Sequence, residues 1–145
     1  MKDVAHELES ILSTVPERLR NIHEGAAASQ PATGKWSKKE TLGHLIDSAA
    51  NNHQRFVRMQ LQGNLELPGY EQDGWIRVQR YQDLPWRDVI ELWRVFNQHL
   101  VHLIRTVDAT ALKHTWRAPD GEIVTLEFIM RDYIVHMKHH LDQIL

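Results

Sequence analysis

The sequence predicts an all-α fold: a four-helix bundle with long connections and one short β-hairpin before the last helix. Four segments carry apolar residues at intervals of three and four, which is the period of a helix with one buried face. Outside the hairpin, no segment shows the sustained alternation of a strand. With 145 residues, of which 42% are hydrophobic and 25% charged, the chain has the size and composition of one globular domain. We therefore expect a single domain over residues 1–145.

The first predicted helix covers Val4–Ile22, where apolar residues recur three or four apart. Pro16 removes a backbone donor inside this run, so we expect either a kink or a new first turn beginning near Thr14. The following stretch, Gly25–Gly34, is rich in Ala, Ser, Gln, Pro and Gly and has no period. Such a composition predicts a loop.

A strong helix-start signal follows this loop. The Ser37 hydroxyl can accept from the Glu40 amide while the Glu40 carboxylate accepts from the Ser37 amide, which is a capping box. It predicts a second helix over about Lys38–Leu61. The segment Asn64–Asp83 carries Gly, Pro, Asp and scattered aromatic residues without clean periodicity. We expect a long connection there, with a short helix around Gly74–Arg80.

The third predicted helix begins after Pro85 and has the clearest pattern in the chain. Its apolar residues form an unbroken stripe with spacings of four and three, made of Val89, Trp93, Phe96, Leu100, Leu103 and Val107.

A hairpin and a fourth helix complete the predicted fold. Thr115–Arg117 and Ile123–Val124 flank a Pro119–Gly121 turn, and we expect this hairpin to be the only β structure. Thr125 then stands as an N-cap before the apolar-periodic run Leu126–Leu145, which predicts the last helix.

The composition limits the possible partners. Seventeen Lys and Arg against 19 Asp and Glu give a formal net charge of −2, so no charge excess favours nucleic acid or an anionic membrane. No signal-peptide apolar region or membrane-spanning run is present, and we expect a cytoplasmic protein. The chain has no cysteine, so a metal ion would have to be held by histidine or carboxylate. Its 10 histidines therefore carry most of the functional information.

His136 and His140 stand four residues apart on the last predicted helix, which is the spacing of helical metal-ligand pairs. By helical arithmetic both lie at the margin of the apolar face, where they would line a cleft. This spacing also arises by chance in a chain rich in histidine. A metal site therefore needs a third ligand from elsewhere in the chain.

His44, near the start of the second predicted helix, is the candidate third ligand. It begins a polar stripe of four residues, namely His44, Ser48, Asn51 and Arg55, which lines a pocket in one interpretation and is a solvated face in the other. Of the other histidines, His6, His23, His53, His114 and His139 are expected at the surface without ligand partners, and we expect no second metal site at His99 and His102.

Six motifs are spread along the chain, namely Gly34–Ser37, His44–Ser48, Arg55–Phe56, Pro68–Glu71 followed by Trp75, Pro119–Glu122 followed by Thr125–Glu127, and His136–His140. Together they resemble the motifs of the DinB superfamily, and more narrowly of its YfiT-type branch. The similarity covers about Leu8 to Leu145. It implies a four-helix bundle, often dimeric, with one divalent metal ion held by His44, His136 and His140. We accordingly expect a homodimer that acts on a small-molecule substrate.

Two kinds of enzyme fit such a site. Three neutral imidazoles suit Zn²⁺ or Ni²⁺ and leave a coordination position open. A weak nucleophile that binds the ion at this position becomes usable at neutral pH. The resemblance implies either a low-molecular-weight thiol such as bacillithiol in an S-transferase, or water in a metal-dependent hydrolase. The alternative from another functional class is a stress-related module that binds a metal ion and catalyses no reaction.

The remaining candidate residues lie on the second predicted helix. Asp47, one turn from His44, could orient a ligand imidazole or accept a proton, or could be a solvent-facing carboxylate of the first turns. Ser48, Asn51 and Arg55 are candidate substrate contacts if their stripe faces the cleft, with Asn51 and Arg55 holding a carboxylate or a sugar.

Overall fold

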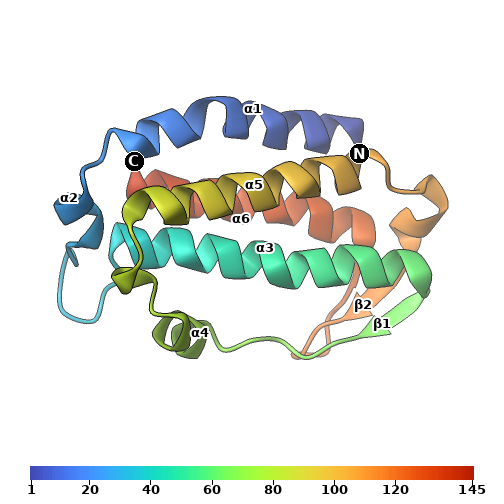
Figure 1. Cartoon of the computed structure of the whole chain (residues 1–145). Coiled ribbons are helices and arrows are strands. Elements are labelled where there is room, and N and C mark those ends of the chain that lie inside the picture. The colour runs from blue at the N-terminus through green and yellow to red at the C-terminus, as the bar shows by residue number, and fades with distance from the viewer.

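Four long helices lie side by side and form the body of the molecule, α1 (Lys2–Arg20), α3 (Lys38–Leu61), α5 (Trp86–Arg105) and α6 (Leu126–Ile144) (Figure 1). The computed structural model describes all residues from 1 to 145. Helix α1 packs along α5, and α3 packs against both α5 and α6. This arrangement confirms the predicted four-helix bundle. None of the helices combines the length and the apolarity needed to cross a membrane.

Helix α1 continues through Pro16 as one helix. The new first turn expected near Thr14 does not form. The Thr14 hydroxyl donates to the backbone carbonyl of Ser10 one turn earlier, as Thr does inside a helix, and it accepts from no backbone amide as an N-cap would. Pro16 itself is buried among the apolar residues of the helix, and this packing offsets the missing backbone donor.

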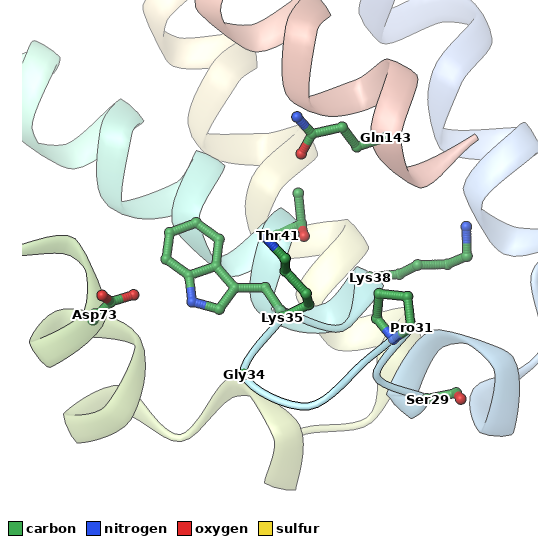
Figure 2. Close-up of a pocket in the computed structure, with 9 residues that line it drawn as sticks. Ser29, Pro31, Gly34, Lys35, Lys38, Thr41, Asp73 and Gln143 are labelled. Carbon is green, nitrogen blue, oxygen red and sulfur yellow. The ribbon is translucent and has the colours of Figure 1, made fainter.

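The expected loop Gly25–Gly34 is partly helical. A short helix, α2 (Glu24–Ala28), begins at His23, whose Nδ1 accepts from the amide of Gly25 at 3.0 Å. The Glu24 carboxylate contacts the ammonium of Lys39 on α3 and accepts from the amide of Trp86 on α5. These tertiary contacts hold a segment that has no periodicity of its own. The chain from α2 to α3 then forms an open loop (Figure 2).

The predicted helix starts are confirmed by their caps. The Ser37 hydroxyl accepts from the Glu40 amide at 3.2 Å, and the Glu40 carboxylate accepts from the Ser37 amide at 2.8 Å. Helix α3 has the predicted bounds. At the start of α6 the Thr125 hydroxyl accepts from the amide of Phe128. Each cap satisfies amides that have no partner inside the helix.

The β structure is larger than predicted. The expected hairpin is present as β2 (Thr115–Arg117) and β3 (Ile123–Thr125), paired antiparallel. A third strand, β1 (Asn64–Glu66), pairs in parallel with β2, so the expectation that the hairpin is the only β structure is wrong. Three residues are too few to show a period, and pairing with β2 creates this strand.

The connection between β1 and α5 contains the predicted short helix, α4 (Gln72–Gln79). A 3₁₀ turn over Tyr81–Asp83 follows it, and a second 3₁₀ turn over Ala109–Lys113 precedes β2. Figure 1 shows α4 lying across the α3 side of the bundle. The connection therefore covers α3 rather than extending into solvent.

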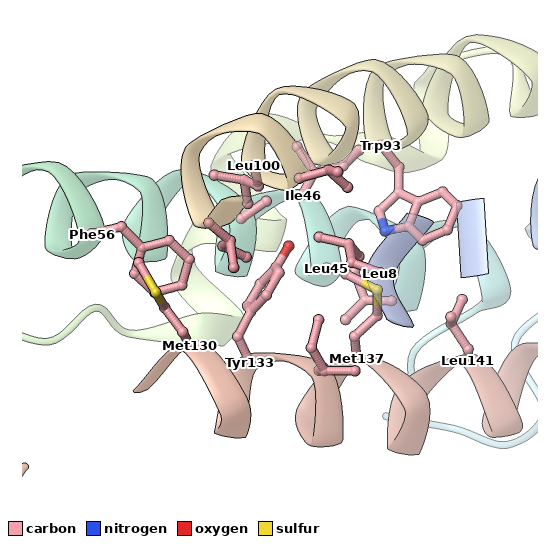
Figure 3. Close-up of a cluster of buried hydrophobic side chains, with 14 of the residues drawn as sticks. Leu8, Leu45, Ile46, Phe56, Trp93, Leu100, Met130, Tyr133, Met137 and Leu141 are labelled. Carbon is pink, nitrogen blue, oxygen red and sulfur yellow. The ribbon is translucent and has the colours of Figure 1, made fainter. Parts of the chain in front are cut away.

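The core of the bundle is filled by apolar side chains from all four long helices, including Leu8, Leu45, Trp93 and Met137 (Figure 3). All four are less than 1% exposed. Full burial of such a side chain stabilises the fold by about 1.5–3 kcal/mol. This packing fixes α3 and α6 beside one another, and these two helices carry the candidate site.

Candidate metal centre

The structure brings His44, His136 and His140 together. One ligand nitrogen of each ring lies within 4.8 Å of the corresponding atoms of the other two. The ring centroids of His44 and His140 are 4.7 Å apart, and those of His136 and His140 are 4.6 Å apart. His44 comes from α3 and the other two from neighbouring turns of α6, as their spacing predicts.

The geometry of these nitrogens fits a shared cation. The Nε2 atoms of His44 and His136 face each other at 3.2 Å. Two ligands of a tetrahedral zinc ion at about 2.05 Å stand about 3.3 Å apart, which matches this separation. The Nδ1 atoms of the same two rings are buried and have no hydrogen-bond partner. Three imidazoles without a thiolate form a donor set that suits Zn²⁺ or Ni²⁺.

The third ring is oriented by a neighbour on its own helix. Nδ1 of His140 lies 3.2 Å from the side-chain oxygen of Gln143. If Nδ1 carries the proton and donates it to Gln143, Nε2 keeps its lone pair for an ion. Gln143 in turn contacts Nε2 of the exposed His139 at 3.0 Å. The sequence alone gave no sign of this role for Gln143, because amide residues one turn from a histidine are common on helix surfaces.

The surroundings keep the three rings uncharged at neutral pH. Burial, and then the proximity of His136 and His140, lowers the pKa of His44 to about 3. Burial is also the main cause that lowers the pKa values of His136 and His140. A neutral imidazole is the form that binds a metal ion, so the site is prepared for ligation without loss of protons.

Asp47 is buried, so the solvent-facing interpretation of this carboxylate is wrong. Its Oδ1 accepts from the Tyr81 hydroxyl at 2.7 Å and from the Gln79 amide, because α4 and the turn after it cover this part of α3. Oδ2 is buried without a partner, and burial raises the pKa of Asp47. Nδ1 of His44 has no partner either, so Asp47 forms no hydrogen bond with that atom.

A cavity of about 360 Å³, which we call the His136 cavity, opens beside the centre. Ser48 and Arg55 of the predicted polar stripe line it together with His136, so this part of the stripe is not a solvated face. Asn51 does not line it, and its amide donates to the backbone carbonyl of Asp47 at 2.9 Å. The neighbouring Asn52 does.

Two further lining residues of the His136 cavity, Tyr70 and Trp116, lie outside α3 and α6. Tyr70 belongs to the connection before α4, and Trp116 to β2. Sequence reasoning assigned neither residue to the site. The Pro68–Glu71 motif contains Tyr70 and could have indicated it, whereas Trp116 in a three-residue strand has no local signal for the cavity that it lines.

A second cavity, of about 660 Å³, lies where the loop before α3 meets the start of α3 and the end of α6. Figure 2 shows Thr41 of α3 and Gln143 of α6 on its walls, with Lys35 on the loop below them. Trp36 also lines it and packs on the His44 ring at a centroid distance of 5.1 Å. None of the three clustered histidines lines this cavity, although Gln143 and Trp36 contact two of them.

The other histidines lie outside the centre. His53, expected as an isolated surface residue, is half-buried and its ring centroid lies 5.4 Å from that of His99 across α3 and α5. This correction arises from helix packing, which brings residues far apart in sequence together. His114 contacts the backbone oxygen of Met59, and His23 caps α2, so both have structural partners. No third ligand-type residue joins the pair of His53 and His99.

Comparison with known proteins gives consistent matches. The sequence model of the DinB superfamily matches residues 7–144. A protein of Halalkalibacterium halodurans, named "putative metal-dependent hydrolase", is 26% identical, with 99% of this chain and 85% of that protein covered. YfiT of Bacillus subtilis carries the same description and is 26% identical over 92% of this chain and 78% of its own length.

The fold has a counterpart among solved structures. The structure of Bacillus subtilis YfiT, described as a probable metal-dependent hydrolase with an unusual four-helix bundle topology, aligns with a TM-score of 0.88 at 22% identity. The alignment covers 99% of this chain and 83% of that chain. This similarity confirms the predicted fold.

Proposed function

This chain belongs to the DinB superfamily, and from this premise we propose that it is a metal-dependent enzyme acting on a small molecule. The observation that carries the proposal is the convergence of His44, His136 and His140, whose ligand nitrogens lie within 4.8 Å of one another. Relatives named as metal-dependent hydrolases support it. In this proposal the three imidazoles hold one divalent ion, Zn²⁺ or Ni²⁺.

An ion with three protein ligands keeps a position for a further molecule and lowers the pKa of a water or thiol that occupies it. The names of the relatives favour water, and thus hydrolysis. A low-molecular-weight thiol such as bacillithiol is the other nucleophile, and S-transfer the other reaction. The alternative is a module that binds a metal ion and catalyses no reaction.

The chain supplies groups for positioning and proton transfer. Asp47 is proposed as a proton acceptor, because its Oδ2 is buried without a partner and burial raises its pKa. Ser48 and Arg55 are proposed as substrate contacts, since they line the His136 cavity. Asn52, which lines the cavity, replaces Asn51, which does not, in this role.

The metal assignment is tested by elemental mass spectrometry on tag-free protein. We expect about one ion per chain in the wild type and in His102→Ala, a control that removes an exposed histidine of α5, and loss of the ion in His44→Ala and His140→Ala. Full occupancy in His44→Ala would show that the three-histidine assignment is wrong. Circular dichroism checks that each variant keeps its helices.

The reaction is tested on the loaded protein with two panels of substrates. One panel contains esters and amides with water as the only nucleophile, and the other pairs electrophiles with low-molecular-weight thiols. Turnover that requires the thiol and is lost in His140→Ala assigns S-transfer, and turnover without thiol assigns hydrolysis. No turnover in either panel favours the non-catalytic module.

The oligomeric state is a further part of the proposal. Similarity to the DinB superfamily implies a homodimer, and analytical ultracentrifugation measures the mass directly. A species of twice the chain mass of 17.0 kDa is expected. A species of 17.0 kDa at all concentrations would contradict the dimer without affecting the metal assignment.

A further inference from the structure

The His136 cavity is lined by one cationic side chain, which is the guanidinium of Arg55. This side chain projects from α3 into a space whose other walls come from α6, the hairpin and the connection before α4. The cavity is also partly apolar, with Val124, Phe128 and Ile129 among its lining residues. A charged group at one end and apolar walls beside it are typical of a site for a small organic molecule.

Two contacts hold the Arg55 guanidinium in place. Its central carbon lies 4.2 Å from the centroid of the Trp116 ring, so one face of the guanidinium plane is covered. One terminal nitrogen donates to the side-chain oxygen of Asn52 at 3.2 Å. A guanidinium has five N–H donors, and this geometry leaves the others without a protein acceptor. The side chain is thus oriented before any ligand arrives.

Arg55 has no counter-ion in the protein. None of the ion pairs of the molecule includes it. The two carboxylates that line the same cavity, Asp132 and Glu122, are exposed and do not pair with it. The Arg55 side chain is half-buried, and removing a cation from water without a partner costs free energy. A bound anion would recover that cost.

We propose that the His136 cavity binds the carboxylate of a small organic acid, with Arg55 as the bidentate anchor and Asn52 and Trp116 as the residues that orient it. The acid places its apolar part against Ile129 and Val124 and its reactive part towards His136. The proposal of a carboxylate-binding site does not depend on the proposed function. The identification of the bound acid as the substrate does rest on the proposed function. Arg55 is thereby a residue that determines specificity.

The charges of the cavity favour a carboxylate over a phosphate. The fork of one guanidinium matches the two oxygens of a carboxylate and balances a single negative charge. A phosphate monoester carries nearly two charges at neutral pH. Asp132 and Glu122 add negative charge at the same cavity, and they penalise a dianion more than a monoanion.

The test measures ligand binding rather than turnover. Metal-free protein is titrated with benzoate, with benzamide as the uncharged analogue and phenyl phosphate as the dianion, and ¹H–¹⁵N spectra follow the Arg55 Nε and Trp116 indole signals. Without the ion, a carboxylate cannot bind by coordination. We expect benzoate to shift both signals, benzamide to shift neither, and phenyl phosphate to bind more weakly than benzoate.

Three variants localise the effect. Arg55→Gln is expected to weaken benzoate binding by about tenfold or more, and Arg55→Lys, which keeps the charge but not the fork, by less. Arg58→Gln removes an exposed arginine one turn further along α3 and is expected to leave the affinity unchanged.

Failure of the carboxylate site and failure of the metal assignment give different results in these experiments. Equal benzoate affinity in Arg55→Gln and wild type, equal binding of benzamide and benzoate, or no shift with benzoate in the millimolar range would overturn the proposal. If phenyl phosphate binds more tightly than benzoate, the cavity is a site for a phosphate ester and not for a carboxylate. If the wild type binds benzoate but no metal, the carboxylate site stands and the proposed function fails.

Discussion

At the scale of single residues, the burial of His44 explains why one imidazole is so suited to ligation. It is 0% exposed, and burial lowers its pKa to about 3, so the ring is neutral at neutral pH. The polar stripe made this residue a candidate third ligand, and the family resemblance implied the ligand role. The sequence could not predict Gln143 or Trp116, because their roles depend on contacts between elements that have no local signal.

The pH dependence of metal binding follows from these shifts. Because burial lowers the pKa values of His136 and His140 below the ordinary 6.5, protons begin to compete with the ion only at more acidic pH than for free imidazole. The apparent Kd should stay nearly constant from about pH 8 to 6.5 and rise as the pH falls further. Competition with a chelator across this range measures it. An apparent Kd that is unchanged at acidic pH would contradict ligation by histidine.

The substitution Asp47→Asn should stabilise the protein at neutral pH. Burial raises the folded-state pKa of Asp47 above its ordinary 3.8, so the ionised form is disfavoured in the fold. A group with a raised folded pKa contributes stability that is present below its unfolded pKa and is lost as the pH rises through its folded pKa. The asparagine avoids that loss and can still accept from Tyr81.

Urea unfolding of the metal-free proteins tests whether Asp47→Asn raises the free energy of unfolding. The free energy of unfolding of Asp47→Asn should exceed that of wild type at about pH 7, and the difference should vanish below about pH 4. A stabilised variant with reduced turnover would identify Asp47 as a group kept for function at a cost in stability. If the variant is less stable than wild type at neutral pH, other interactions in the fold offset the free-energy cost of burying the Asp47 carboxylate.

At the scale of elements, the sequence predicted those parts whose pattern is repeated over several turns. Helices α3, α5 and α6 were predicted close to their observed bounds because periodicity and caps act within each helix. Helix α2 and strand β1 were not predicted from the sequence. Glu24 of α2 is held by contacts with Lys39 and Trp86, and β1 exists only because it pairs with β2. Short elements owe their conformation to tertiary partners.

Gly43→Ala tests how closely the cover over α3 is packed. In an exposed helix this change stabilises by about 1 kcal/mol. Here an added Cβ would lie 2.2 Å from the ring of Tyr81, whose hydroxyl donates to Asp47. The overpacking should instead destabilise by about 1–3 kcal/mol and displace the turn that carries Tyr81.

Urea unfolding and the near-ultraviolet signal of the tyrosines measure the two effects of Gly43→Ala. In the double variant with Tyr81→Ala the ring is absent, so adding alanine at position 43 should become stabilising. Destabilisation that persists in the double variant would place the clash elsewhere.

At the scale of the whole molecule, the centre joins segments far apart in sequence, His44 from α3 and His136 with His140 from the last helix. The long helices and their apolar faces predicted the bundle, but not which faces of α3 and α6 meet. The packing of Leu45 and Met137 in the core determines that arrangement. The histidine cluster is therefore a property of the complete fold and should not persist in the unfolded chain.

Removal of the ion should for this reason lower the thermal stability of the bundle. A ligand that binds only the folded state stabilises it by about 2.7 kcal/mol at a free concentration of 100 Kd. For a domain of this size that corresponds to a rise in Tm of about 5–10 °C. Scanning calorimetry with Zn²⁺ or Ni²⁺, and after chelation, measures the shift. We expect it in wild type and in His102→Ala, and not in His140→Ala. An equal shift in His140→Ala would mean that the ion stabilises the bundle from another position, such as the pair of His53 and His99 between α3 and α5.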